Sequence, residues 1–135
     1  MQAFYAEEGI VFDGATQGRA LDALLGDPAL GEVFLLQPTE PDKTAHAFGH
    51  LVLTRGHSLE FGGRFLLLDE LYLVPELRGR GEGTRAIAFA ADHARRSGAH
   101  ALRLEVSRHN PRAQATYLRA GFVPETRDLM TLRLD

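Results

Sequence analysis

The segment Leu71–Thr84 reads LYLVPELRGRGEGT, and the rest of the chain is best interpreted outward from it. A short apolar run, Phe65–Leu68, leads into this segment, with two acidic residues between them. An alanine-rich stretch from Thr84 to Ser97 follows it. We therefore predict a strand, a glycine-rich turn and a helix, in that order.

The turn combines glycine with arginine in a way that suits an anion. Glycine adopts dihedral angles that a side chain forbids, and it lets a ligand approach the backbone closely. The first turn of the following helix presents unpaired N–H groups with a partial positive charge, and successive N–H groups in a turn form an anion-binding nest. Arg78 and Arg80 add positive charge. A pyrophosphate would be well stabilised here.

Three known phosphate-binding patterns can be compared with this turn. The P-loop requires a lysine, and the chain's only lysine is Lys43. The dinucleotide fingerprint requires a third glycine where the chain has Thr84. The pattern [RQ]-G-x-G-x-[GA] remains, and Arg78–Gly83 fills it completely. Taken alone, these six residues also fit a tight strand-to-helix turn or a chance match.

The loop resembles the acetyl-CoA pyrophosphate loop of the GNAT superfamily of N-acetyltransferases, and a second motif of that superfamily follows. This motif is an asparagine, a small residue, a tyrosine and a Gly-Phe pair. In this chain its members are Asn110, Ala113, Tyr117, Gly121 and Phe122. Two motifs from separate regions are more specific than either one alone. The resemblance covers roughly residues 64–123, near half of the chain.

The resemblance implies acetyl-CoA as cosubstrate and a defined path for it. The strand at residues 64–74 should splay from the strand at 101–107, with pantetheine in the gap and the pyrophosphate on the loop. Asn110 is implied as a cofactor contact, although it is equally explained as a helix N-cap. The implied cofactor-binding residues are Leu71, Tyr72, Leu73, Arg78, Gly79, Arg80, Gly81, Glu82, Gly83, Thr84 and Asn110.

The same resemblance assigns a catalytic role to Tyr117. In the superfamily this position protonates the leaving thiolate of CoA. A phenol can donate a hydrogen bond to negative charge that develops on sulfur. The alternative is a half-buried tyrosine that packs against the sheet.

Asp69 and Glu70 interrupt an apolar strand, where carboxylates are rare without partners. An amine with a pKa near 10.4 is neutral in only about one in 2,500 molecules at pH 7, so a base would help. In the polyamine acetyltransferase branch the first residue of a similar pair is the base, which maps to Asp69, and Glu70 would hold the cation. Neighbouring strand residues face opposite sides, so without a bulge only one of the two points into the acceptor pocket. Because the register of the strand is open, both are candidates. An ion pair with Arg64 or Arg103 is the alternative.

The rest of the chain is predicted to contain both helices and strands. We predict an α+β (mixed α/β) fold in one domain, residues 1–135. The resemblance implies a mostly antiparallel, splayed sheet of six to seven strands, flanked by three to four helices. The predicted helices are 15–25, 84–97 and 110–120, the predicted turn is 37–43, and the predicted strands are 2–6 with 10–12, 33–36, 46–54, 64–74, 101–107, 122–124 and 129–134.

Composition narrows the class of protein further. The 135 residues are 44% hydrophobic and 24% charged, as in an ordinary globular domain. No long apolar run and no signal peptide pattern is present, so we predict a cytoplasmic protein without membrane contact. The absence of cysteine excludes disulfides and a thiol nucleophile. The net charge of −3 argues against nucleic acid as a partner, and the six histidines lack metal-ligand spacing.

We therefore predict an enzyme that moves an acetyl group from acetyl-CoA to an amine acceptor, a small molecule or a peptide. Both substrates would be bound together, because no cysteine can carry the acyl group. The alternative is a non-catalytic acetyl-CoA-binding module that regulates a partner. It would keep the arginine and glycine loop but would need neither Tyr117 nor Asp69. The chain is also a candidate for homodimer formation.

Overall fold

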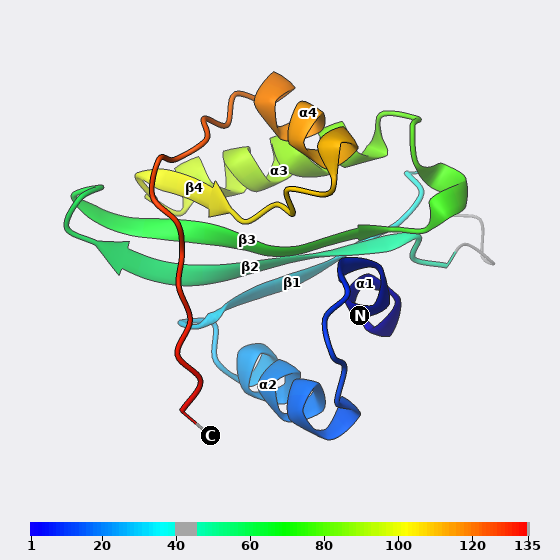
Figure 1. The fold of residues 1–135 in the computed structure, drawn as a ribbon, viewed down its shortest axis with the longest axis horizontal. Coiled ribbons are helices and arrows are strands. Elements are labelled where there is room, and N and C mark those ends of the chain that lie inside the picture. The colour runs from blue at the N-terminus through cyan, green and yellow to red at the C-terminus, as the bar shows by residue number, and fades with distance from the viewer. Residues whose placement is uncertain (40–45, 135) are drawn as a thin grey trace.

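A computed structural model describes residues 1–39 and 46–134 of the chain. Four strands form one sheet in the order β1-β2-β3-β4 (Figure 1). β2 is antiparallel to β1 and to β3, whereas β4 runs parallel to β3. The strands are β1 (Gly31–Leu36), β2 (Gly49–Ser58), β3 (Gly63–Leu73) and β4 (Ala101–Leu104).

The helices cover both faces of this sheet. Figure 1 shows α3 and α4 on one side and α1 and α2 on the other. A single 3-10 turn, Pro75–Leu77, joins β3 to the loop before α3. The helices are α1 (Gln2–Glu8), α2 (Gly14–Gly26), α3 (Glu82–Arg96) and α4 (Pro111–Arg119). None of the helices in the described ranges has the length and apolar character that crossing a bilayer requires.

The core lies between α3 and the two long strands. Three alanines of α3 are buried at a spacing of four residues, so their small side chains let the helix approach the sheet closely. They pack against leucines of β2 and β3, each of which contributes roughly 2 kcal/mol by burial. These residues are Ala86, Ala90, Ala94, Leu51, Leu53, Leu66 and Leu68. The core thus holds β3 and α3 rigidly on either side of the glycine-rich loop.

Most of the predicted elements are confirmed to within a few residues. Helices occur where the ranges 15–25, 84–97 and 110–120 predicted them, and the hairpin from residue 33 to residue 54 is antiparallel. The turn predicted at 37–43 falls mainly outside the described residues. The strand predicted at 101–107 ends at Leu104.

The predicted strand at the start of the chain is wrong, because Gln2–Glu8 forms α1. Glutamine, alanine and glutamate are good helix formers, and these local preferences outweigh a weak alternation of apolar residues. Gly9 then ends the helix in a left-handed conformation with φ 67°. The aromatic side chains of Phe4 and Tyr5 pack on each other edge to face.

The closing strands predicted at 122–124 and 129–134 are also wrong. Residues 122–134 contain no strand, so the sheet has four strands and not six to seven within the described chain. Pro124 lacks a backbone N–H, which disfavours pairing of the first segment. The second segment has a strand-like pattern but finds no neighbouring edge in this chain.

Candidate functional site

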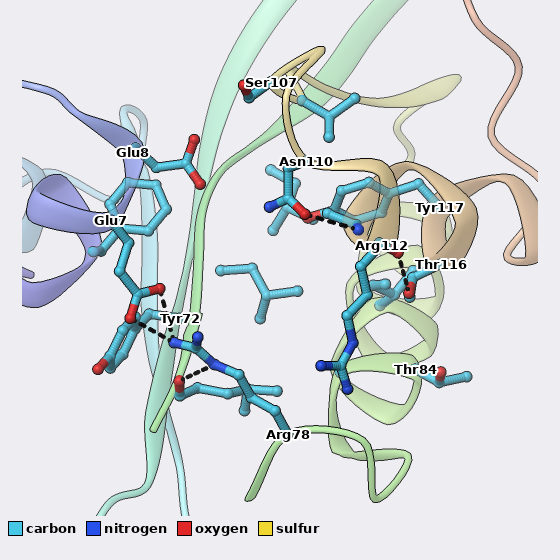
Figure 2. Close-up of a pocket in the computed structure, with 18 of the residues that line it drawn as sticks. Glu7, Glu8, Tyr72, Arg78, Thr84, Ser107, Asn110, Arg112, Thr116 and Tyr117 are labelled. Carbon is cyan, nitrogen blue, oxygen red and sulfur yellow. Dashed lines mark hydrogen bonds and ion pairs between the residues drawn. The ribbon is translucent and has the colours of Figure 1, made fainter. Parts of the chain in front are cut away.

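A cleft opens where β3 and β4 separate. The two strands pair only from Phe65 opposite Ala101 to Leu68 opposite Leu104. Beyond that point β3 continues along β2 to its end, while the chain after β4 turns away toward α4. The resulting cavity has a volume of about 460 Å³ and lies between the loop, α4 and the end of β3 (Figure 2). This is the splay that the resemblance implies.

The glycine-rich loop forms the predicted nest at one end of the cleft. Gly79 and Gly81 have φ angles of 74° and 86°, a left-handed conformation that favours glycine. Gly81 is also the N-cap of α3. Within the described chain, the N–H groups of residues 79–84 have no acceptor. Six donors therefore remain available to an anion at the positive end of the α3 dipole.

The side chain of Arg78 points away from this nest and forms hydrogen bonds that fix the position of the loop. Its Nε donates to the carbonyl oxygen of Leu73 at 2.9 Å, and its Nη2 donates to both carboxylate oxygens of Glu7 at 2.9 and 2.8 Å. The guanidinium also lies 5.5 Å from the ring centroid of Tyr72. Arg78 thereby ties the loop to the end of β3 and to α1, and a contact with the cofactor stays a prediction.

Arg112 is a residue of the cleft that sequence reasoning missed. Figure 2 shows its side chain reaching from the start of α4 toward the loop. A Cβ atom built on Gly79 would lie 2.8 Å from Arg112 Nη2, so the two segments are in close approach. Arg112 forms no ion pair with the described acidic residues. Its place two residues after the Asn110 cap, in the first turn of α4, is the sequence signal that could have indicated it.

Asn110 and Tyr117 lie near opposite ends of α4, and both line the cleft. Asn110 Oδ1 accepts a hydrogen bond from the Ala113 N–H at 3.1 Å, so its role as a cap is confirmed. The ring of Tyr117 packs edge to face on Phe122, with centroids 5.7 Å apart. Burial, and then the charge of Glu8, raise the pKa of Tyr117, so the phenol is protonated at neutral pH.

The Tyr117 hydroxyl is open to the cleft. It has no hydrogen-bond partner among the described side chains. No side-chain nitrogen or oxygen of the described residues is both fully buried and unpartnered. The hydroxyl therefore meets the cavity, where a ligand atom could accept its proton.

The acidic pair sits at a β-bulge. In the pairing of β2 with β3, Val52 lies opposite Glu70 and Leu53 lies opposite Leu68, which leaves Asp69 as the extra residue. The bulge turns Asp69 toward the cleft, while Glu70 stays 5% exposed beneath α1. Both carboxylates line a second cavity of about 350 Å³ that adjoins the first. The alternation rule that allowed only one of them to face the site fails at the bulge.

Histidine, and not arginine, is the partner of Glu70 in this pair. His50 Nε2 lies 2.7 Å from Glu70 Oε2, and the imidazole stacks on Tyr72 at 5.7 Å. Arg103, the suspected partner, instead lies over the rings of Phe61 and Phe65. The alternative of an ion pair with Arg64 or Arg103 is wrong, since neither pairs with these carboxylates among the described ion pairs.

The surroundings of Asp69 make its carboxylate a stronger base than that of a free aspartate, although the residue as a whole is exposed. Burial raises its pKa first, followed by the negative charges of Glu70 and Glu105. Tyr5 of α1 lies near Glu70, and burial, followed by the charge of Glu70, raises the pKa of the Tyr5 phenol. Sequence reasoning missed both Tyr5 and His50, because their proximity depends on the docking of α1 and on the register of β2.

The fold and the cleft together define an α+β protein with two splayed strands and a glycine-rich helix start, a shape suited to an extended phosphorylated ligand. Residues 7–122 match the Acetyltransferase (GNAT) family, and the chain belongs to this family. Membership implies acetyl-CoA as the ligand. The family resemblance carried by the two sequence motifs is thus confirmed. The finer resemblance to the polyamine acetyltransferase branch is not.

Solved structures share this fold. An integron cassette protein, HFX_CASS3, from the mobile metagenome of Cole Harbour Salt Marsh is 32% identical and superimposes with a TM-score of 0.80, over 98% of this chain and 79% of that chain. A protein described as a possible acetyltransferase from Clostridium difficile 630 shares the fold, with 19% identity and a TM-score of 0.77, over 99% and 86% of the two chains.

A curated relative matches over a shorter stretch. The uncharacterized N-acetyltransferase YhfO of Bacillus subtilis (strain 168) is 35% identical over 63 residues. The matched stretch covers 47% of this chain and 42% of YhfO, so it spans less than half of either protein.

Proposed function

We propose that the protein transfers the acetyl group of acetyl-CoA directly to a primary amine. The observation that carries this proposal is the arrangement of the cleft. The anion nest, the free edge of β3 and the open hydroxyl of Tyr117 line one cavity, and Asp69 stands at its junction with a second. The proposed acetyl-CoA site and the proposed amine site therefore adjoin at Asp69, the base, with Tyr117, the acid, in the first cavity.

The donor would lie along the cleft from the loop to the bulge. The unpaired N–H groups of residues 79–84 would hold the pyrophosphate, with Arg112 closing over it from α4. Pantetheine would follow the backbone of Leu71–Leu73, the part of β3 that β4 leaves unpaired. This path brings the thioester to the end of the cleft near Tyr117.

The chemistry would need one attack and three proton transfers. The ammonium form of the acceptor first gives a proton to Asp69, directly or through water, because only the neutral amine is a nucleophile. The amine nitrogen then attacks the carbonyl carbon of the thioester, a backbone N–H near Leu73 stabilises the oxyanion, and the nitrogen gives its second proton to water. The carbon–sulfur bond then breaks, and Tyr117 donates its proton to the departing thiolate. The chain has no cysteine to form an acyl-enzyme.

The second cavity favours a cationic acceptor. Four carboxylates line it, and no lysine, arginine or histidine does so among the described residues. Phe4 and Tyr5 add aromatic surface, which attracts ammonium groups. An acceptor with a second positive charge, as in polyamines, would suit this lining. The carboxylates are Glu8, Asp69, Glu70 and Glu105.

The absence of cysteine also makes the test simple. Free CoA can be followed with a thiol reagent, because the protein itself gives no signal. A panel of diamines, lysine-like amines, neutral amines and alcohols would be offered with acetyl-CoA. We expect CoA release with amines, fastest with those that carry two positive charges. Binding of acetyl-CoA without release on any amine would instead support the non-catalytic module.

A further inference from the structure

The imidazole of His50 and the carboxylate of Glu70 form a buried pair that takes no part in the proposed proton transfers. His50 Nε2 and Glu70 Oε2 are 2.7 Å apart, and the two side chains are 12% and 6% exposed. Burial of a carboxylate is costly unless a hydrogen bond replaces those lost to water. Within the described chain that hydrogen bond comes from His50, so His50 determines where the Glu70 carboxylate lies.

The pair exists because of the bulge in β3. Without the bulge Asp69 would lie opposite Val52 in β2, whereas with it Glu70 takes that position. His50 precedes Val52 by two residues, so His50 and Glu70 share one face of the sheet as diagonal neighbours. The bulge thus brings Glu70 to the histidine and leaves Asp69 to face the cleft.

Two aromatic rings hold the imidazole of His50 in this position. It stacks on Tyr72 with the ring centroids 5.7 Å apart, and Phe4 of α1 packs on it edge to face at 6.4 Å. These contacts leave the imidazole little freedom to turn away from Glu70. His50 is not among the described residues that line either cavity, so it can affect a ligand there only through Glu70.

The other oxygen of Glu70 opens into the second cavity. His50 occupies Oε2, and no hydrogen bond of the described chain reaches Oε1. Every fully buried side-chain oxygen or nitrogen in that part of the chain has a partner, so Oε1 is not fully buried. Glu70 lines the second cavity together with the aromatic residues Phe4 and Tyr5. A carboxylate with one oxygen fixed by a histidine therefore offers the other oxygen to a ligand.

We propose that His50 is a positioning residue for the acceptor, an inference that rests on the proposed acetyl transfer to an amine. His50 Nε2–H donates to Glu70 Oε2, because an ionised carboxylate can only accept. Glu70 Oε1 is thereby held to accept a hydrogen bond from a second amino group of the acceptor, while the reacting nitrogen lies at Asp69. Hydrogen bonds between charged groups are short and strong. The pair therefore selects acceptors with two amino groups over acceptors with one.

The first test compares two acceptors that differ by a single amino group. Diaminobutane and butylamine have the same carbon chain, and the release of CoA from acetyl-CoA gives kcat/KM for each. The wild type should prefer diaminobutane. His50→Phe keeps a ring to stack on Tyr72 but removes the hydrogen bond to Glu70. The preference should then fall by roughly tenfold, mainly through a higher KM for diaminobutane.

Further variants separate positioning from packing. His50→Gln should restore much of the preference, because its amide places a donor near the position of Nε2. His50→Asn has a shorter amide that cannot reach Glu70, and it replaces His50→Phe if that variant does not fold. His57→Phe is the control and should keep the wild-type preference, since His57 is exposed on the same strand. A wild type without preference, or a preference that His50→Phe keeps or His50→Gln does not recover, would overturn the proposal.

The second test measures binding without the reaction. Diaminobutane is titrated calorimetrically into the wild type and into His50→Phe, each in the presence of CoA, which has no acetyl group to transfer. The wild type should bind it, and the variant should bind roughly tenfold more weakly. If the wild type binds diaminobutane in this way but releases no CoA from acetyl-CoA, the proposed transfer is wrong and the role of His50 is supported. If CoA is released but the affinity does not depend on His50, or diaminobutane does not bind, the role of His50 is wrong.

Discussion

The hydroxyl group of Tyr117 distinguishes an enzyme from a non-catalytic binding module, because only an enzyme needs its proton. Tyr117→Phe keeps the ring that packs on Phe122 and removes only the proton donor. We expect turnover to fall by about 10² to 10⁴, the usual contribution of a general acid. The affinity for acetyl-CoA should hardly change, because thiolate charge develops only in the transition state.

Steady-state kinetics with calorimetric binding would check this expectation. Tyr72→Phe is a suitable control, since Tyr72 stacks on His50 and only its backbone is assigned to the cofactor. If Tyr117→Phe turns over like the wild type, Tyr117 has only its packing role.

Asp69 should show opposite effects on activity and on stability. Its raised pKa means that the folded state holds the proton more tightly than the unfolded chain does. The rate should therefore rise with pH through this raised pKa, as the carboxylate becomes able to accept a proton. Over the same range the folded state becomes less stable. Its stability falls as pH rises from the ordinary aspartate pKa through the raised pKa of Asp69, because the ionised group is disfavoured in the folded protein.

Asp69→Asn tests both effects in one protein. We expect slower turnover, with the pH dependence moved toward the pKa of the acceptor amine. At pH 7 the variant should unfold at the same or a higher temperature than the wild type. Near pH 3 the two melting temperatures should converge, since Asp69 is then protonated in both states. An unchanged pH–rate profile would show that another group takes the proton.

Arg112 should contribute to cofactor affinity and not to the chemical step. It approaches the loop from α4 and has no acidic partner in the described chain. Arg112→Ala should raise the KM for acetyl-CoA by roughly tenfold, with kcat little changed, because a phosphate contact is the same in the ground state and the transition state. Arg95→Ala, near the far end of α3, should leave both constants unchanged. Equal effects of the two substitutions would exclude a specific contact.

At the scale of the elements, the start of α3 is where backbone conformation and ligand binding coincide. Gly81 has φ 86°, and a Cβ at this position would meet no atom within 4 Å. Gly81→Ala therefore acts through the dihedral angle alone and should cost about 1–2 kcal/mol of stability. Because the strain turns the nest N–H groups, the dissociation constant of acetyl-CoA should rise by about tenfold or more.

Gly62 provides a matched control in the β2–β3 turn. Its φ is 73°, and a Cβ there would also meet nothing within 4 Å. Gly62→Ala should lower the melting temperature to a similar extent but leave acetyl-CoA binding intact. Calorimetric titration of both variants would separate the two effects. Normal binding by Gly81→Ala would place the phosphates elsewhere.

For the molecule as a whole, bound acetyl-CoA should stabilise the folded state against unfolding. The cleft is lined by α1, β3, the loop, α3 and α4, so a bound ligand contacts elements from both ends of the chain. At a hundredfold excess over the dissociation constant, binding stabilises by about 2.7 kcal/mol, which corresponds to a rise in melting temperature of roughly 10 °C. A thermal scan at millimolar acetyl-CoA, with free adenine as control, would measure it. No shift would contradict the donor site.

The local features of the site follow from the sequence alone. The strand, loop and helix between residues 64 and 97 follow from apolar patterning and from glycines at left-handed positions. The Asn110 cap likewise depends on a side chain and an N–H group three residues apart. These features were predictable because short-range sterics and hydrogen bonding act within a few residues along the chain.

Which distant groups come into contact depends on the packing of the whole chain. The bulge at Asp69 depends on the register of β2, which also places His50 beside Glu70. Residues 2–8 satisfy local preferences for a helix, and their packing against β3 brings Glu8 to the second cavity. Residues 129–134 have the pattern of a strand, yet a strand exists only where another edge takes its hydrogen bonds, and that edge is a property of the assembled sheet.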